Sequence, residues 1–194
     1  MKEDLNMLSV EKLGILFPIK ISEYCPDWKT LFASEKEVIQ GAIGIRNMLR
    51  IEHIGSTAVP GLSAKPTIDI LLEIKKHINN DLIINKLISI NYSYIPKPEN
   101  PPPHMMFAKG YSNKGYISQT YHIHVRYKGD WDEVIFRDYL IQNPKVAQEY
   151  AELKFKLASD FLNDREKYTN SKTEFITRVT SNARNKKKKQ FRKS

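Results

Sequence analysis

A glycine-serine turn, followed by an aspartate in the next apolar run, is the part of this sequence whose residue types best suit chemistry. Gly55 and Ser56 follow the short run RIEHI, and Asp69 lies within TIDILLEI. Glycine lets the backbone approach a ligand closely, successive N–H groups in such a turn can bind phosphate oxygens, and Ser56 adds a hydroxyl. Asp69 is a hard oxygen ligand that could hold a magnesium ion bridging those phosphates. Without further support, the same residues also fit an ordinary turn and a solvated strand aspartate.

Two histidines and an arginine share one face of a later predicted strand. His122, His124 and Arg126 alternate with apolar residues in the run YHIHVRY, so their side chains point the same way. The histidines are about 7 Å apart along the strand, close enough for both imidazoles to reach one ion or one phosphate group. Together with Asp69 they would suit manganese, zinc or iron better than magnesium. The alternative is an exposed polar face, on which Arg126 forms a salt bridge across the sheet instead of binding an anionic substrate.

Two lysines are candidate donors to phosphate oxygens. Lys65 directly precedes the Asp69 run, and Lys109 stands beside Gly110 in a region rich in proline and glycine. Most lysines are solvated surface residues, so Lys65 is the stronger candidate because of its neighbours.

Three predicted strands must position these side chains. Residues 50–54 lead into the turn, 67–74 carry Asp69, and 116–127 carry the histidines. In the second strand, alternate positions are wholly apolar, and Asp69 falls on the other face. If the strands belong to one sheet, their polar faces should line one cleft, with Asp69 near His122 or His124.

The other elements are predicted from periodicity and from breakers. Residues 15–24 are expected to be extended, 92–95 to form a short strand, and 96–115 to form a long loop around a triple proline. Helices are expected to start near residue 27, at residues 81–90 and 131–142, and from about residues 144 and 171. The mixture of strands and helices predicts one α/β domain, because 194 residues suit a single core.

The positive charge of the chain is concentrated at its end. The formal net charge is +9, and residues 184–194 contain seven Lys or Arg and no acid. Residues 183–194 are therefore predicted to be a basic disordered tail, dispensable for folding, and residues 1–182 to be the domain. Weak contact of this tail with RNA is one expectation.

The remaining composition excludes several classes of protein. Cys25 is the only cysteine, which rules out an intramolecular disulfide and a cysteine-based zinc site. No run approaches the roughly 20 apolar residues of a membrane span, and the first residues, MKEDLNMLSV, include acids where a signal peptide would be apolar. We expect a cytoplasmic protein without a membrane partner.

A longer stretch resembles a known family. Residues 51–74, IEHIGSTAVPGLSAKPTIDILLEI, resemble the signature of the bacterial GrpB family, and the likeness extends to residues 13–28, 121–125 and 136–154. The resemblance implies a nucleotidyltransferase-like fold similar to that of polymerase-beta-type enzymes: a mixed sheet with helices mainly on one face, plus C-terminal helices. It also implies a site at Gly55, Ser56 and Asp69 that handles a nucleotide with a divalent metal, magnesium or manganese.

The sequence departs from the superfamily pattern at one position. Those enzymes carry a second acid two residues after the first, whereas this chain has Leu71. Glu73 is about 13 Å from Asp69 along the strand, too far to share metals that sit about 4 Å apart. Leu71→Asp is the change expected to restore the second acid.

Three functions therefore remain open. The first is binding of a nucleotide or another phosphorylated small molecule through Gly55, Ser56 and Lys65, with Asp69 holding a metal and a nucleotidyl group transferred to an acceptor. The second is a binding module of the same fold without turnover, and the third is RNA recruitment by the tail.

Overall fold

A five-stranded mixed sheet forms the centre of the protein. The structure, a computed structural model, describes residues 8–97, 99–100 and 103–191. The strands lie in the order β1-β2-β5-β4-β3, with β2 parallel to β5 and all other neighbours antiparallel. Their bounds are β1 Met48–Ile54, β2 Thr67–Ile74, β3 Ser93–Ile95, β4 Met105–Ser112 and β5 Gly115–Tyr127.

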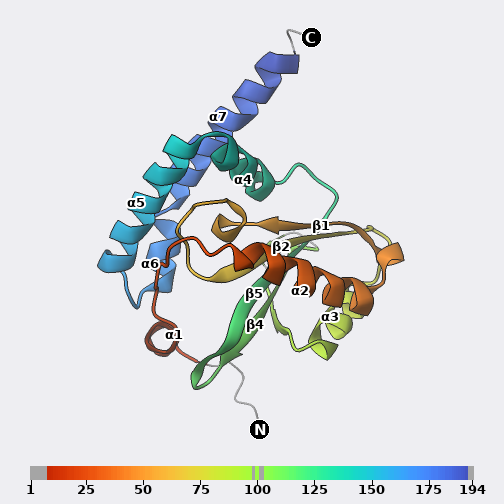
Figure 1. Ribbon diagram of the computed structural model, residues 1–194. Helices are drawn as coiled ribbons and strands as arrows, with labels where there is room; N and C mark the ends of the chain where they lie inside the picture. Colours follow the sequence, from red (N-terminus) through yellow and green to blue (C-terminus); the bar gives the residue numbers. More distant parts are fainter. Residues whose placement is uncertain (1–7, 98, 101–102, 192–194) are drawn as a thin grey trace.

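Helices cover the sheet unequally. Helices α2 (Asp27–Ile43) and α3 (Asn80–Ser89) pack on one face, where Ile39, Ile43, Ile83 and Leu87 join the main core. Four helices follow the sheet: α4 (Asp132–Gln142), α5 (Pro144–Asp160), α6 (Arg165–Asn170) and α7 (Thr173–Phe191). They form a second layer with its own apolar cluster against the loop after β1 (Figure 1). The predicted α/β class, with a mixed sheet and added C-terminal helices, is confirmed.

Burial of β2 on both faces fits its interior place in the sheet, between β1 and β5. Ile68, Ile70, Leu72 and Ile74 project into the main core, as predicted. The other face carries Asp69 and Leu71, and Leu71 is also fully buried, with 0% exposure. A strand buried on both faces suits the middle of a sheet that is covered on both sides.

Two predicted elements differ from the structure. The segment 96–115, expected to be one long loop, contains strand β4. Its prolines and glycines predict a loop, but hydrogen bonding to β5 makes residues 105–112 a strand. The segment 15–24, expected to be extended, begins as helix α1 (Val10–Leu16) and then makes a single bridge from Ser22 to Ala64. Ser9 caps α1 by accepting a hydrogen bond from the Lys12 backbone N–H.

The basic end of the chain is helical where the structure describes it. Helix α7 runs to Phe191, Ala183 is buried, and Arg184 pairs with Asp130 and Asp132 at 2.6 Å each. The prediction of a disordered tail from residue 183 is therefore wrong at its start, because the apolar and ionic contacts of α7 continue past Asn182. Residues 192–194 of that tail lie outside the described residues.

Truncation tests this boundary. We expect removal of residues 183–194 to lower the unfolding free energy by about 1 kcal/mol, or roughly 2–4 °C in Tm, because it deletes Ala183 and the Arg184 pairs. Truncation after Lys187 keeps both contacts and should leave Tm unchanged in a thermal melt. Equal melting of the full chain and both truncated forms would show that α7 past Asn182 contributes nothing.

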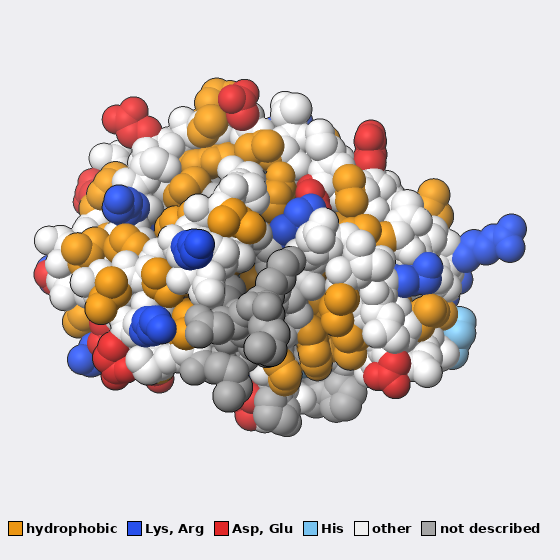
Figure 2. Space-filling view, turned by 90° about the horizontal axis from the view of Figure 1, so that it is seen from below, with side chains coloured by type: hydrophobic (Ala, Val, Ile, Leu, Met, Phe, Trp, Pro, Cys, Tyr) orange, Lys and Arg blue, Asp and Glu red, His pale blue; other side chains and the backbone are white. Residues whose placement is uncertain are grey.

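The described surface shows no large block of one charge in the view from below. Figure 2 shows Lys and Arg side chains interspersed with Asp, Glu and hydrophobic side chains on this face. Within the described part of the chain, no helix has the length and apolar character needed to cross a bilayer.

Candidate functional site

Asp69 meets both predicted histidines on the second face of the sheet. In the parallel ladder, Asp69 pairs with His122 and Leu71 with His124, and paired residues project to the same face. Asp69 Oδ1 lies 3.3 Å from His122 Nδ1 and 3.5 Å from His124 Nε2. All three side chains are partly exposed, at 28%, 15% and 22%. The prediction that the two strands place these residues together is confirmed, whereas their role as metal ligands stays a prediction.

The protonation of this group follows from burial and mutual contact. Burial raises the pKa of Asp69, but hydrogen bonding from His122 and His124 outweighs it and holds the pKa below its ordinary value. Burial lowers the pKa of His122 more than Asp69 raises it. At neutral pH the carboxylate is therefore charged and the His122 imidazole neutral. Because Asp69 can only accept, His122 Nδ1 carries the proton and Nε2 accepts from the Tyr111 hydroxyl, 2.9 Å away.

Gly55 is fixed against Asp69. Its backbone has φ 71° and ψ −173°, a region that residues with a side chain rarely adopt. A Cβ added at Gly55 would stand 2.5 Å from Asp69 Oδ2. Ser56 follows at the start of the short 3-10 helix η3 (Ser56–Ala58), and Val59 directly after η3 packs in the apolar cluster of the C-terminal helices. The turn thus contacts the carboxylate on one side and the helical layer on the other.

Two lysines, Lys65 before β2 and Lys172 between α6 and α7, lie within electrostatic reach of this carboxylate. Burial, together with the charges of Arg165 and Lys172, lowers the pKa of Lys65 to about 8, against the opposing effect of Asp69. Burial also lowers the pKa of Lys172 to about 8, against the opposing effect of Asp69. Lys154 is buried and donates to the Ser63 carbonyl beside Lys65. Sequence analysis identified only Lys65, because Lys154 and Arg165 belong to helices, and Lys172 to the turn between α6 and α7, without a recognisable motif.

Lys109 does not join the site. It lies on the α2 face of β4, paired with Tyr121, and its Nζ bonds Glu35 of α2 at 2.8 Å. The prediction that Lys109 binds a ligand phosphate at this site is wrong, because it assumed a loop where the strand register turns this side chain to the opposite face.

Arg126 shares the face of the histidines but lies two residues beyond His124. It is 4% exposed, its Nη1 donates to the Val125 carbonyl at 2.9 Å, and its Nη2 lies 3.7 Å from Glu133. Four strand residues separate Arg126 from His122, a span of about 13 Å. Arg126 is therefore an element of the sheet-helix packing, not a neighbour of Asp69.

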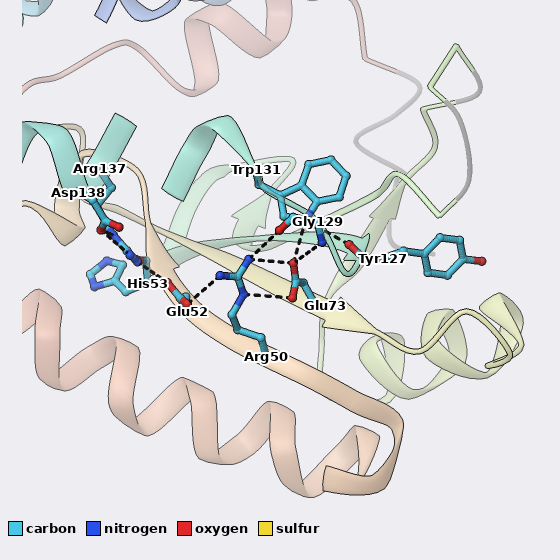
Figure 3. A network of polar contacts seen from close by, with 9 residues as sticks. All are labelled: Arg50, Glu52, His53, Glu73, Tyr127, Gly129, Trp131, Arg137 and Asp138. Carbon is cyan, nitrogen blue, oxygen red and sulfur yellow. Dashed lines mark hydrogen bonds and ion pairs between the residues drawn. The ribbon is translucent and has the colours of Figure 1, made fainter. Parts of the chain in front are cut away.

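Glu73, the nearest further acid on β2, is already saturated with donors. Its carboxylate accepts from Arg50 Nη2 at 2.8 Å, from the Gly129 N–H at 3.0 Å and from Trp131 Nε1 at 2.9 Å (Figure 3). These bonds tie β1 and β2 to the start of α4. Glu73 thus has a structural role and does not replace the missing second acid.

A second contact fastens α4 to the strand that enters the turn. Arg137 Nη1 donates to Glu52 at 2.8 Å and to the His53 carbonyl at 2.7 Å, while its Nη2 bonds Asp138 (Figure 3). The end of β1 is therefore held directly before Gly55.

The metal-ligand set predicted from the sequence is not complete as it stands. Among the described residues, no three His, Cys, Asp or Glu side chains form a group that could hold a metal ion. Instead, His122 Nδ1 and His124 Nε2 both contact Oδ1 of Asp69.

Comparisons with known proteins support the family resemblance of residues 51–74, which include the turn. A family model described as GrpB protein matches residues 18–182. A UPF0157 protein of Pseudomonas aeruginosa is 40% identical over 160 residues, which are 81% of this chain and 64% of that relative. The glutamate-rich protein GrpB of Alkalihalophilus pseudofirmus is 35% identical over 181 residues, 89% of this chain and 98% of the relative.

A solved structure supports the same assignment. The crystal structure of GrpB from Enterococcus faecalis has a TM-score of 0.74 and 32% identity, covering 86% of this chain and 98% of that chain. With the family model spanning most of the chain, the resemblance seen in residues 51–74 is confirmed, and the chain belongs to the GrpB family.

Proposed function

We propose that this chain binds a nucleotide or a related phosphorylated small molecule in the space between the second sheet face and the C-terminal helices. The observation that carries the proposal is the setting of Asp69. A charged carboxylate, held against Gly55 and two imidazoles, lies within the electrostatic reach of Lys65 and Lys172. Cations around a single carboxylate suit a phosphate ligand together with its counter-ion.

A divalent metal, magnesium or manganese, fits this site only together with the ligand. Asp69 alone is one carboxylate ligand, and magnesium in proteins is commonly held by one or two carboxylates plus the phosphates of the substrate. When bound, the ion would neutralise phosphate charge. The chain's own part is to fix Asp69 through Gly55, His122 and His124.

Recognition without turnover is the function that Leu71 favours. The position of the second acid is a fully buried leucine, and Glu73 is saturated by Arg50, Gly129 and Trp131. Transfer of a nucleotidyl group, the second candidate, would need another group beside Asp69, and His124 is the side chain at that place. Release of pyrophosphate from a nucleoside triphosphate with manganese would show that transfer takes place.

The Asp69→Asn variant tests the binding proposal. A ligand at a hundred times its Kd stabilises the native state by about 2.7 kcal/mol, roughly 5–10 °C for a chain of this size. We expect nucleotide with magnesium or manganese to give such a shift in the wild type, and binding to weaken at least tenfold in Asp69→Asn, because the amide loses the charge that balances the cation. The measurement is a thermal-shift titration, with each variant's ligand-free Tm as its own reference.

Asp81→Asn is the matched control, because Asp81 is an exposed aspartate at the start of α3, away from the site. It should bind as the wild type does. Unchanged metal and nucleotide binding in Asp69→Asn would mean that Asp69 is a structural residue and that the proposed site is wrong.

A further inference from the structure

A basic pocket lies beside the Asp69 group, at the N-terminal end of β2. This cavity of about 380 Å³ opens between the segment after α1, the starts of β2 and α6, and the middle of β5. Its volume falls within the roughly 300–1,000 Å³ of small-molecule sites. Its polar lining includes three cations, Lys20, Lys65 and Arg165, and three hydroxyl-bearing residues, Thr67, Thr120 and Tyr111.

No acid in the lining of this basic pocket balances its positive charge. Its lining contains three cations and no acid, and none of the three takes part in an ion pair with another described residue. Lys65 contacts the Tyr168 ring at 5.5 Å, and Arg165 donates to the Phe17 carbonyl at 2.9 Å. Gathering like charges without a counter-ion is unfavourable, and an anion in the cavity would relieve it.

Neighbouring hydrogen bonds hold the floor of the basic pocket in place. Thr67 and Thr120 share a hydrogen bond of 2.9 Å between their hydroxyls, and Thr120 also donates to the Pro66 carbonyl at 3.2 Å. Gln119 donates to the same carbonyl at 2.6 Å. These bonds use the protons of Thr67, Thr120 and Gln119 internally, so they order the floor of the pocket and leave the cations to bind an anion.

Tyr111 connects the basic pocket to the Asp69 group. Its ring lines the cavity, and its hydroxyl is bonded to His122 Nε2, whose other nitrogen contacts Asp69. A ligand seated in the pocket therefore has the Asp69 group as its next neighbour along the sheet face.

We propose that the basic pocket binds the phosphate group of a phosphate monoester, with Arg165, Lys20 and Lys65 as its charged contacts. A monoester carries close to two negative charges at neutral pH and three acceptor oxygens, which match a guanidinium fork and two ammonium groups. This site needs neither Asp69 nor a metal, and so it goes beyond the function proposed above. The rest of the ligand extends past Tyr111.

The test measures binding of inorganic phosphate and of phenyl phosphate to the full chain by calorimetry, in EDTA and at constant ionic strength. We expect the wild type to bind both, and the double change Lys20→Gln with Arg165→Gln to weaken binding tenfold or more. Lys20 is exposed, so Lys20→Gln alone keeps the fold and should give a smaller loss of the same sign.

Lys167→Gln is the matched control, because Lys167 belongs to α6 like Arg165 but has a 70% exposed side chain that pairs with Asp164 outside the basic pocket. It should leave phosphate binding within twofold of the wild type. No binding by the wild type, or an equal loss in Lys167→Gln, would overturn the proposal. Since EDTA removes any metal-dependent binding, phosphate binding under these conditions is independent of the Asp69 proposal, and failure of either leaves the other standing.

Discussion

The Gly55→Ala variant is expected to lose about 2–6 kcal/mol of unfolding free energy and to lose ligand binding at the Asp69 group. The backbone at φ 71° and ψ −173° costs a residue with a side chain about 1–3 kcal/mol. A methyl group 2.5 Å from Asp69 Oδ2 must also displace the carboxylate, and overpacking of this kind costs about 1–3 kcal/mol more. Denaturant unfolding measures the first effect and the nucleotide thermal shift measures the second.

Gly61 offers a matched control for the two parts of this cost. It also has a positive φ, 77°, but a Cβ added there meets nothing within 4 Å. Gly61→Ala should therefore carry only a backbone cost and should keep ligand binding. In an Asp69→Ala background, Gly55→Ala should cost less than in the wild type, because the carboxyl atoms at 2.5 and 3.1 Å are gone and only Cβ at 3.0 Å remains. Equal costs in both backgrounds would show that the glycine is needed for its φ alone.

The strands of the site could be predicted from the sequence because their alternation is local. In residues 67–70 of β2 and 121–127 of β5, apolar residues alternate with polar ones, which assigns Asp69, His122 and His124 to the same kind of face. That the two strands are parallel neighbours is a matter of tertiary pairing. From the need to bury both apolar faces, the sequence predicts only that the two strands share one sheet with their polar faces together, not that they are parallel neighbours.

The site residues that the sequence misplaced or missed depend on tertiary contacts. Lys109 was misplaced because prolines and glycines concealed β4, whose strand character comes from pairing with β5. Arg165 of α6 and Lys172 of the turn before α7 come within electrostatic reach of Lys65 only because the C-terminal helices fold back over the sheet. No spacing in the sequence relates these cations to residues 55–69. Their place near the site is therefore known only from the structure.

Leu71→Asp is expected to destabilise the protein by about 3–5 kcal/mol at neutral pH, the usual effect of leaving a buried charge uncompensated. From the sequence, this change should restore the second acid of the superfamily. In the structure, however, Leu71 is 0% exposed, and its neighbour on β1 is Glu52, already engaged by Arg50 and Arg137. The new carboxylate would face burial and a like charge, both of which raise its pKa.

The pH dependence of the stability lost in Leu71→Asp distinguishes the effect of the buried charge from the effect of the changed side-chain shape. An aspartate whose pKa is raised by folding is harmless below its unfolded value of about 3.9, and its destabilising effect grows as pH rises from there towards neutrality. Leu71→Asn, with the same shape and no charge, should lack this growth, so the difference in unfolding free energy between the two variants should widen from pH 4 to pH 7. Leu71→Met, which conserves volume, should cost less than about 1.5 kcal/mol. If Leu71→Asp instead keeps wild-type stability and gains manganese binding, position 71 can host a second metal ligand. The chain would then be one substitution from a two-metal site, and recognition without turnover would be a consequence of the leucine alone.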